Sequence, residues 1–327
     1  MRRIAAIDWL QALLGKGQRW LARRRGPGKE VRIPPAVLRE PGAAPAQALQ
    51  PLKRVLVTAE VARVMFGEYA AHRVTERGEE EIGWVLLGRR DLAEATVLAS
   101  LPAGADRESG EAHVRFNSVA QIIASRFVRQ RDRRIGMLGV VHTHPGSLRH
   151  PSDGDYRGDI EWVGQLRGGE GIFGIGTADG KFAGHADEIW SPRDNIQALG
   201  DLCLTWYSLR SEARNYRTIP VELIDGPDLA APLRTVWPIL EEHGDRLDRL
   251  AQQIAKVSFE VIHDEQHSSL AMNVVLPGAD RKLRAVLGKK EILYFLVRDG
   301  AVLAADLRDP YVDRGIYRLL ADVAEGV

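Results

Sequence analysis

The sequence predicts an α/β fold, in which a β-sheet is flanked by helices, followed by a second domain of the α+β class. The first observation is that residues 53–195 alternate between segments of helical period and short apolar runs of strand length. The second is that residues 257–306 alternate as strands, with helix-like segments on either side. A length of 327 residues agrees with about two domains and is ample to bury a hydrophobic core.

Residues 1–52 precede the predicted sheet and divide into two parts. In residues 1–25 apolar side chains recur at helical spacing among basic ones, which predicts a basic amphipathic helix. Gly15 and Gly17 weaken a long helix, and we interpret the segment as packing on its own protein. Weak contact with a membrane surface, or docking on a partner, is the alternative. Residues 26–51 are rich in Pro, Gly and Ala and are predicted to be a linker.

The predicted first domain is built from segments that follow one another along residues 53–195. Thr58 is a good N-cap, so a helix is expected to begin near it. Amphipathic spacing predicts two more helices, at residues 118–130 and 152–166. Apolar runs bounded by turn residues predict strands at residues 82–90, 95–104, 112–117, 135–145, 171–180 and 187–192.

The texture of the sequence changes after residue 195, and we place the domain boundary there, within about ten residues. Residues 200–216 and 228–256 have helix-like spacing. A final helix is predicted at residues 312–324. Strands are predicted at residues 257–263, 270–277, 291–300 and 301–307. Together these form an α+β domain over residues 196–327, whose role the sequence leaves open.

Composition and charge exclude several classes of protein. The formal net charge is +1, so we expect no nucleic-acid partner. Cys203 is the single cysteine, which excludes an intramolecular disulfide and a cysteine-rich zinc finger. No apolar run approaches the ~20 residues needed for a transmembrane segment, and the first residues lack the pattern of a signal peptide. We therefore expect a cytoplasmic protein.

The most informative stretch is GMLGVVHTHPGSLRHPSDGD, residues 136–155. A buried strand is predicted to end at Val141, and His142 and His144 follow it. Side chains two residues apart on an extended chain point to the same side, so both imidazoles can face one point at the end of the strand. Pro145 then stops ladder pairing and fixes the exit of the chain.

The same stretch supplies a carboxylate. Ser152 and Asp155 lie three residues apart at the expected start of a helix. Two imidazole nitrogens and one carboxylate oxygen make a three-ligand set. Zinc in catalytic sites takes three protein ligands and keeps a fourth position for water. The stretch therefore predicts a catalytic zinc site with His142, His144 and Asp155 as its ligands.

The complete pattern is His-x-His-Pro, six residues, Ser, two residues and Asp, and it resembles the JAMM motif of the MPN+ metalloproteases, including the prokaryotic JAB proteins. The matching residues are His142, His144, Pro145, Ser152 and Asp155, without gap or substitution. The resemblance covers roughly residues 53–195. It implies the JAMM/MPN fold, a cytidine-deaminase-like β-sheet flanked by helices, with Zn²⁺ as the metal.

The resemblance also implies a catalytic glutamate on the strand after the first helix. The sequence EEEIGWVLLG matches the family's pattern of Glu, a glycine-containing pair and an apolar run that ends in Gly. Counting back seven residues from Gly88 gives Glu81, whereas anchoring on the glycine of the pair favours Glu80. Trp84 stands where the family usually has a small residue. We expect Glu81 to be the base and keep Glu80 as the alternative.

The function that the resemblance implies is a zinc-dependent isopeptidase or peptidase, similar to a deubiquitinase. Such an enzyme cleaves or matures a ubiquitin-like protein at its C-terminal tail. Glu81 would take a proton from the zinc-activated water and deliver it to the leaving amine, and Ser152 would donate a hydrogen bond to the oxyanion. Expected partners are a ubiquitin-like protein or its conjugates, together with enzymes of a conjugation pathway. The Arg- and Ala-rich composition suggests a bacterial protein, and bacterial relatives act in defence against phage.

Three other functions stay open. An amidase of small substrates, or a peptidase acting on a sulfur-carrier protein, would use the same chemistry. A non-catalytic MPN scaffold is the second alternative, which the intact motif disfavours. A JAMM protein associated with nucleic acid is the third; the near-neutral charge disfavours it, whereas the basic residues 1–25 favour it.

Other polar residues near the motif have ordinary interpretations. His150 is expected to be a surface histidine and Asp153 a cap or turn residue. Asp159 is expected to be a carboxylate on the helix face rather than a group that orients the site. His263 and His267 lack the order His-Glu-x-x-His, so no second metal is expected there.

Overall fold

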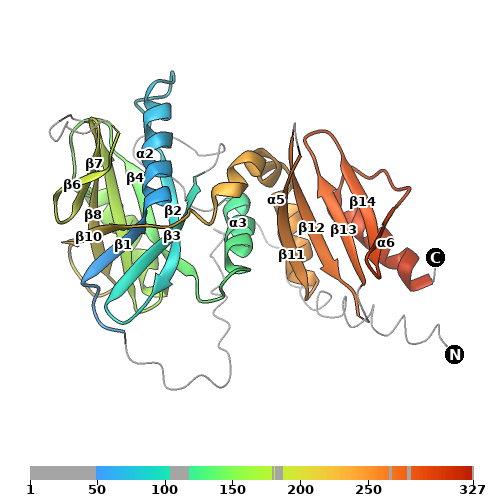
Figure 1. The fold of residues 1–327 in the computed structure, drawn as a ribbon. Coiled ribbons are helices and arrows are strands. Elements are labelled where there is room, and N and C mark those ends of the chain that lie inside the picture. The colour runs from blue at the N-terminus through green and yellow to red at the C-terminus, as the bar shows by residue number, and fades with distance from the viewer. Residues whose placement is uncertain are drawn as a thin grey trace, which may run out of the picture. The chain divides into compact units, whose positions relative to one another are not determined.

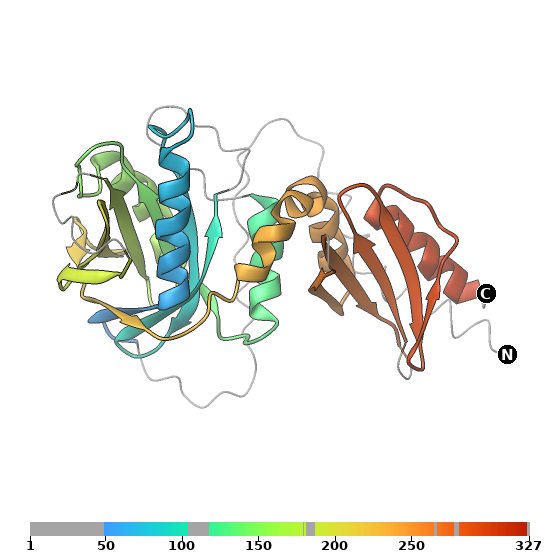
Figure 2. The ribbon, with the colours of Figure 1, turned by 45° about the horizontal axis from the view of Figure 1, so that its top comes forward.

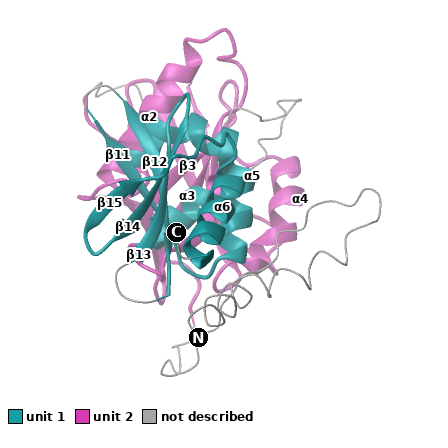
Figure 3. Cartoon of the chain, turned by 90° about the vertical axis from the view of Figure 1, so that its right-hand side faces the viewer, with its two compact units in different colours: residues 1–33, 122–130, 232–327 teal, residues 34–121, 131–231 magenta. Residues whose placement is uncertain are grey.

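The computed structural model describes residues 49–103, 118–178, 180, 187–264, 267–277 and 281–325. The predicted N-terminal helix, most of the predicted linker and the strand predicted at residues 112–117 lie outside the described residues. The chain divides into two compact units (Figure 3). Unit 2 spans residues 34–121 and 131–231, and unit 1 includes residues 122–130 and 232–327.

Unit 2 is built on one mixed β-sheet flanked by helices (Figure 1), which confirms the predicted α/β fold class. The strand order is β10-β1-β3-β2-β4-β5-β8-β7-β6, and β9 pairs with β8. The strands are β1 (Arg54–Thr58), β2 (Gly83–Arg90), β3 (Glu94–Pro102), β4 (Gly136–Thr143), β5 (Glu170–Thr177), β6 (Trp190–Arg193), β7 (Ile196–Leu199), β8 (Leu202–Arg210), β9 (Arg217–Thr218) and β10 (Val221–Ile224). Strand β4 therefore lies in the interior of the sheet, between β2 and β5.

Helix α2 (Ala59–Arg73) lies against the sheet (Figure 2) and forms the main core with it. Met65 and Phe66 are fully buried and belong to the same apolar cluster as Trp84 and Trp206 of the strands. Burying an apolar side chain of this size stabilises the fold by ~1.5–3 kcal/mol. The helix begins directly after Thr58, close to the predicted start. The Thr58 hydroxyl does not cap it but donates to the carbonyl of Pro227 at 3.0 Å, and the strand that ends at Thr58 was not predicted.

The prediction of a helix at residues 200–216 is wrong. Strand β8 occupies most of this segment, is almost entirely buried and pairs with β5 and β7. A strand buried on both faces is a continuous apolar run, and periodicity cannot distinguish such a run from a buried helix. The sheet consequently continues past the boundary predicted at residue 195, as far as Ile224.

Unit 1 contains a five-stranded antiparallel sheet with helices packed on it. Consecutive strands pair in the order β11-β12-β13-β14-β15. Helix α6 (Val312–Glu325) ends within one residue of its prediction, whereas the strand at residues 281–287 was not expected. The remaining elements are α3 (Val119–Arg129), α5 (Trp237–Gln253), β11 (Val257–His263), β12 (Ser268–Val275), β13 (Arg281–Leu287), β14 (Ile292–Arg298) and β15 (Ala301–Ala304). Across the described ranges, no helix has the length and apolar character needed to cross a bilayer.

A buried ion pair ties β2 to β5 near the ends of both strands. Glu170 accepts from the Arg90 guanidinium at 3.2 Å and from the backbone N–H of Leu52 at 2.7 Å. The side chains of Arg90 and Glu170 are 3% and 1% exposed, so bulk water solvates neither charge. Removing one partner of such a pair leaves the other charge buried without compensation.

We expect Glu170→Gln to lower the free energy of unfolding by ~3–5 kcal/mol, because it leaves the Arg90 charge uncompensated inside the protein. Urea unfolding followed by circular dichroism measures this change. The matched control is Glu94→Gln, which removes a carboxylate from the exposed pair with Arg54 and should change stability little. Equal unfolding midpoints for the two variants would contradict the importance of the buried pair.

Candidate metal centre

Backbone pairing on both sides fixes the end of β4, where the two histidines lie. His142 is the penultimate residue of β4 and pairs with Gly83 of β2 and with Ile175 of β5. The pairing continues past the strand, since the N–H of His144 donates to the carbonyl of Gly176 at 2.8 Å. Both histidines are buried. The chain is therefore still extended at His144, which places the two imidazoles on the same side as predicted.

Gly139 explains how β4 can pair so closely with β5. Its φ is +153°, and a Cβ on it would lie 1.7 Å from the carbonyl oxygen of Ile172. The pairing of β2 with β4 shifts register between Leu86 and Leu87, opposite this position. Glycine is required here because any side chain would push β5 away from the strand that carries His142.

Asp155 reaches the histidines from the first turn of helix α4 (Asp153–Trp162). Ser152 is the N-cap of this helix, and the two residues form a capping box. The hydroxyl of Ser152 accepts from the N–H of Asp155 at 3.1 Å, and the Asp155 carboxylate accepts from the N–H of Ser152 at 2.5 Å. This reciprocal pair satisfies two helix N–H groups that would otherwise have no partner and fixes the carboxylate relative to the backbone.

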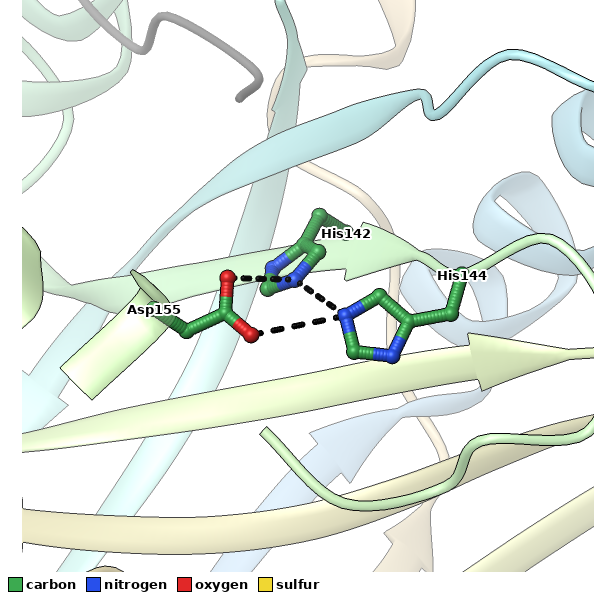
Figure 4. Close-up of side chains that lie close together, drawn as sticks. All are labelled: His142, His144 and Asp155. Carbon is green, nitrogen blue, oxygen red and sulfur yellow. Dashed lines mark hydrogen bonds and ion pairs between the residues drawn. The ribbon is translucent and has the colours of Figure 1, made fainter. Parts of the chain in front are cut away.

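The three predicted ligands converge on one point (Figure 4). The Nε2 atoms of His142 and His144 are 3.0 Å apart. The Asp155 Oδ1 atom is 3.2 Å from the first of these nitrogens, and its Oδ2 atom is 3.4 Å from the second. Ligands ~2.0–2.1 Å from a tetrahedral zinc ion are themselves about 3.4 Å apart. The geometry and the mixed N/O donor set therefore fit zinc, while the roles of these residues as ligands stay predictions.

Hydrogen bonding prepares His144 to bind a metal through Nε2. Its Nδ1 atom is 2.9 Å from the carbonyl oxygen of Leu148. A carbonyl only accepts, so Nδ1 carries the proton and donates, which leaves the lone pair of neutral imidazole on Nε2. A partner of this kind on the outer nitrogen is usual for histidines that bind metals.

The same cluster shifts the pKa values of its members. Burial by itself would lower the pKa of His144, but hydrogen bonds with Asp155 and the Leu148 carbonyl, and the charge of Glu81, raise it above the ordinary value. Burial likewise would raise the pKa of Asp155, but the hydrogen bonds with His142 and His144 outweigh burial and hold it well below the ordinary value. Asp155 is therefore ionised, as a metal ligand must be.

Strand pairing also brings Glu81 to this site. Glu81 lies two residues before Gly83, and continuing the register of β2 with β4 places it opposite His144. The pairing continues at Ile82, the residue after Glu81, since the carbonyl of Ile82 accepts from the N–H of Thr143 at 2.8 Å. The Oε2 atom of Glu81 is shielded from solvent, and its charge acts on the His144 imidazole.

Glu80, the alternative base, is engaged elsewhere. Its carboxylate accepts from the guanidinium of Arg77 through both oxygens, at 2.8 and 2.9 Å from Nε. Its backbone carbonyl is 2.9 Å from the Nε2 atom of His72. Of the two glutamates, Glu81 is the one that the register directs toward the histidines.

Asp159 differs from its expected place on an open helix face. It lies one turn after Asp155, and the Tyr216 hydroxyl donates to its carboxylate at 2.7 Å. Burial raises the pKa of Asp159 to about 6, although the hydrogen bond from Tyr216 and the charge of His142 oppose this shift. Asp159 thus anchors the helix that carries the third predicted ligand.

Tyr216 belongs to an aromatic cluster that holds α4 on the sheet. Its ring makes edge contacts with Phe173 of β5 at 5.4 Å and with Tyr156 of α4 at 6.3 Å between centroids. The hydroxyl of Tyr156 donates to the carbonyl of Ala213 at 3.0 Å. Tyr216 ends the segment predicted as a helix, so no local pattern indicates this contact. The pairing of β8 with β5 is what brings the segment to α4.

The other polar residues near the motif lie as follows. The hydroxyl of Tyr207 donates to the carbonyl of Arg149 at 2.8 Å and lies 3.1 Å from Nδ1 of His150, so His150 has a fixed partner. Asp153 is exposed in the first turn of α4. His263 and His267 are exposed. Within the described residues, His142, His144 and Asp155 form the one group of three or more side chains that could bind a metal ion together.

These features define a candidate metal centre, built at a strand end and a helix start. Residues 62–190 match the family described as prokaryotic homologs of the JAB domain. No curated protein matches the chain. Among solved structures, protein DSY2949 from Desulfitobacterium hafniense is 19% identical, with 53% of this chain and 94% of that chain covered and a TM-score of 0.33.

We expect Tyr216→Phe to weaken zinc binding by about tenfold, the lower end of the range for residues that support metal ligands from outside the ligand shell. The physical reason is that Asp159 loses its hydroxyl donor and α4 loses an anchor. Competition with a zinc-chelating dye measures the affinity. Tyr294→Phe is the matched control, because it removes a buried tyrosine hydroxyl from unit 1. Equal zinc affinities for the two variants would show that Tyr216 does not position the site.

Proposed function

We propose that this protein is a zinc-dependent peptidase or isopeptidase that cleaves or matures a ubiquitin-like protein at its C-terminal tail. The observation that carries the proposal is the spacing of the two Nε2 atoms and the Asp155 carboxylate, together with Glu81 placed by register beside His144. The match of residues 62–190 to the prokaryotic JAB family supports the reaction class, since JAB proteins include hydrolases.

Each residue has a role that follows from its place. His142, His144 and Asp155 would hold the metal. A zinc ion held by three ligands would polarise a scissile carbonyl and lower the pKa of a water molecule toward ~7. Glu81 would accept the proton of the attacking water and deliver it to the leaving amine. The hydroxyl of Ser152 accepts from the helix backbone, which leaves its proton free to donate to the oxyanion of the substrate.

The choice of a ubiquitin-like substrate rests on the resemblance to JAMM proteases. An extended, flexible tail is the form of substrate that can lie along a strand and present one carbonyl to the centre. The loop between His144 and Ser152 has mostly exposed residues, Leu148 among them at 54%. A protein tail therefore has exposed surface to approach, next to the two buried histidines.

We expect Glu81→Gln to keep zinc at the level of the unchanged protein but to lower the hydrolytic rate by ~10²–10⁴-fold, because the amide cannot accept the proton. Asp155→Ala should lose the metal and the activity together. Zinc content by mass spectrometry and initial rates on the same samples separate the two effects. Glu80→Gln is the control and should leave both unchanged. Full activity in Glu81→Gln would refute its role as the base.

We expect the purified zinc-loaded protein to release the extension from a ubiquitin-like protein that is C-terminally extended, because its tail can reach the centre in an extended conformation. Mass spectrometry of the products identifies the bond that is cut. Small acyl-amino acids are the comparison substrates, and faster hydrolysis of these would favour a small-substrate amidase. Protein that binds no zinc and cleaves neither substrate would favour a non-catalytic scaffold.

A further inference from the structure

Unit 1 carries a basic groove between α5 and α6, which lie side by side (Figure 3). The groove has a volume of about 690 Å³ and is lined mainly by α6, with Arg246 contributed by α5. Arg314 and Arg318 of α6 line it together with Tyr311, a residue that is 42% exposed. Neither the zinc motif nor the proposed hydrolase activity involves these residues.

Two aspartates hold the arginines in place without neutralising them. Asp309 has a fully buried side chain and pairs with Arg314 at 2.5 Å and with Arg318 at 3.2 Å. Asp313 pairs with Arg246 at 2.9 Å and with Arg249 at 3.8 Å. In this cluster, four guanidinium groups against two carboxylates leave a charge of +2. Arg249 belongs to the cluster through its pair with Asp313 and is not one of the residues that line the groove.

The arginines keep hydrogen-bond donors for a ligand. The guanidinium group has five N–H donors, and the contacts with Asp309 are made by Nε of Arg314 and a terminal nitrogen of Arg318. The side chains of Arg314 and Arg318 are more than half exposed. The planar fork of arginine binds carboxylates and phosphates through two parallel hydrogen bonds, so this cluster is arranged to receive anionic groups.

Tyr311 determines which kind of anion fits best. The Arg246 guanidinium lies over its ring at 3.9 Å from the centroid, and that of Arg314 lies at 4.9 Å. These stacked guanidinium groups occupy the ring, so the ring is a poor platform for a nucleobase. The groove is also open, whereas sites for small molecules bury most of their ligand.

We propose that this groove binds an acidic peptide segment of a partner protein, with at least two carboxylates received by the guanidinium groups. Gly315 supports the geometry, because a Cβ there would lie 2.2 Å from the Tyr294 ring of β14, and α6 can approach the sheet only without it. The floor of the groove is thereby fixed, and the arginines are presented from a rigid helix. Charge complementarity selects the partner.

The test is direct binding of a fluorescein-labelled octapeptide of alternating Glu and Leu to the full-length protein, measured by anisotropy. We expect the double variant R249Q/R318Q to weaken binding at least about tenfold, because the net charge of the cluster of four arginines and two aspartates falls to zero. This variant leaves Arg314 on Asp309 and Arg246 on Asp313, so both acids keep a partner and the fold should be retained. Unchanged thermal unfolding of the variant checks this.

The matched control is R281Q/R298Q, which removes the same charge from a facing pair on β13 and β14. It should bind the acidic peptide like the unchanged protein. Equal binding by both double variants, or equal binding of a peptide with Gln in place of Glu, would overturn the proposal. ATP and inorganic tripolyphosphate are the competing probes. If either binds more tightly than the peptide and depends on Arg249 and Arg318, the groove is a phosphate site and the peptide proposal fails.

Discussion

The pairing of β4 with β2 and β5 is the constraint on which the candidate metal centre depends. This pairing keeps the chain extended through His144 and gives the two imidazoles a common direction. The same register brings Glu81, more than sixty residues away in the sequence, opposite His144. The bulge at Gly139 lets β4 approach β5 closely enough for this. The position of the metal ligands is therefore set by backbone hydrogen bonds, and the side chains need little adjustment.

The parts of the site that depend on local spacing could be predicted from the sequence. His142 and His144 are separated by the period of a strand, and Asp155 follows a capping serine by one helical turn, so local geometry determines their directions. Glu81 required strand register, which is a long-range property, and the pattern of the sequence left Glu80 as an alternative. In the structure Arg77 engages Glu80, and the register places Glu81 opposite His144. The roles of these residues in binding and catalysis stay predictions.

The parts that could not be predicted depend on contacts between distant segments. Strand β8 is buried at every position but its last, and such a run shows neither the 3.6-residue period of a surface helix nor the two-residue period of a half-buried strand. Because this strand was predicted as a helix, the neighbouring Tyr216 could not be placed beside Asp159. The basic groove of unit 1 was missed for a related reason. Its arginines come from two helices separated by a five-stranded sheet in the sequence, and no local pattern connects them.

The Asp155 carboxylate has two structural roles at once. One carboxylate closes the capping box of α4 and also faces both imidazoles. Protonating it in acid would therefore remove a helix cap and a metal ligand in the same step, so demetallation and unwinding of the first turn are thermodynamically linked. In the opposite direction, a bound cation would favour the ionised carboxylate and so strengthen the cap. Metal binding would in this way make the first turn of α4 more ordered, a change that amide hydrogen exchange can follow.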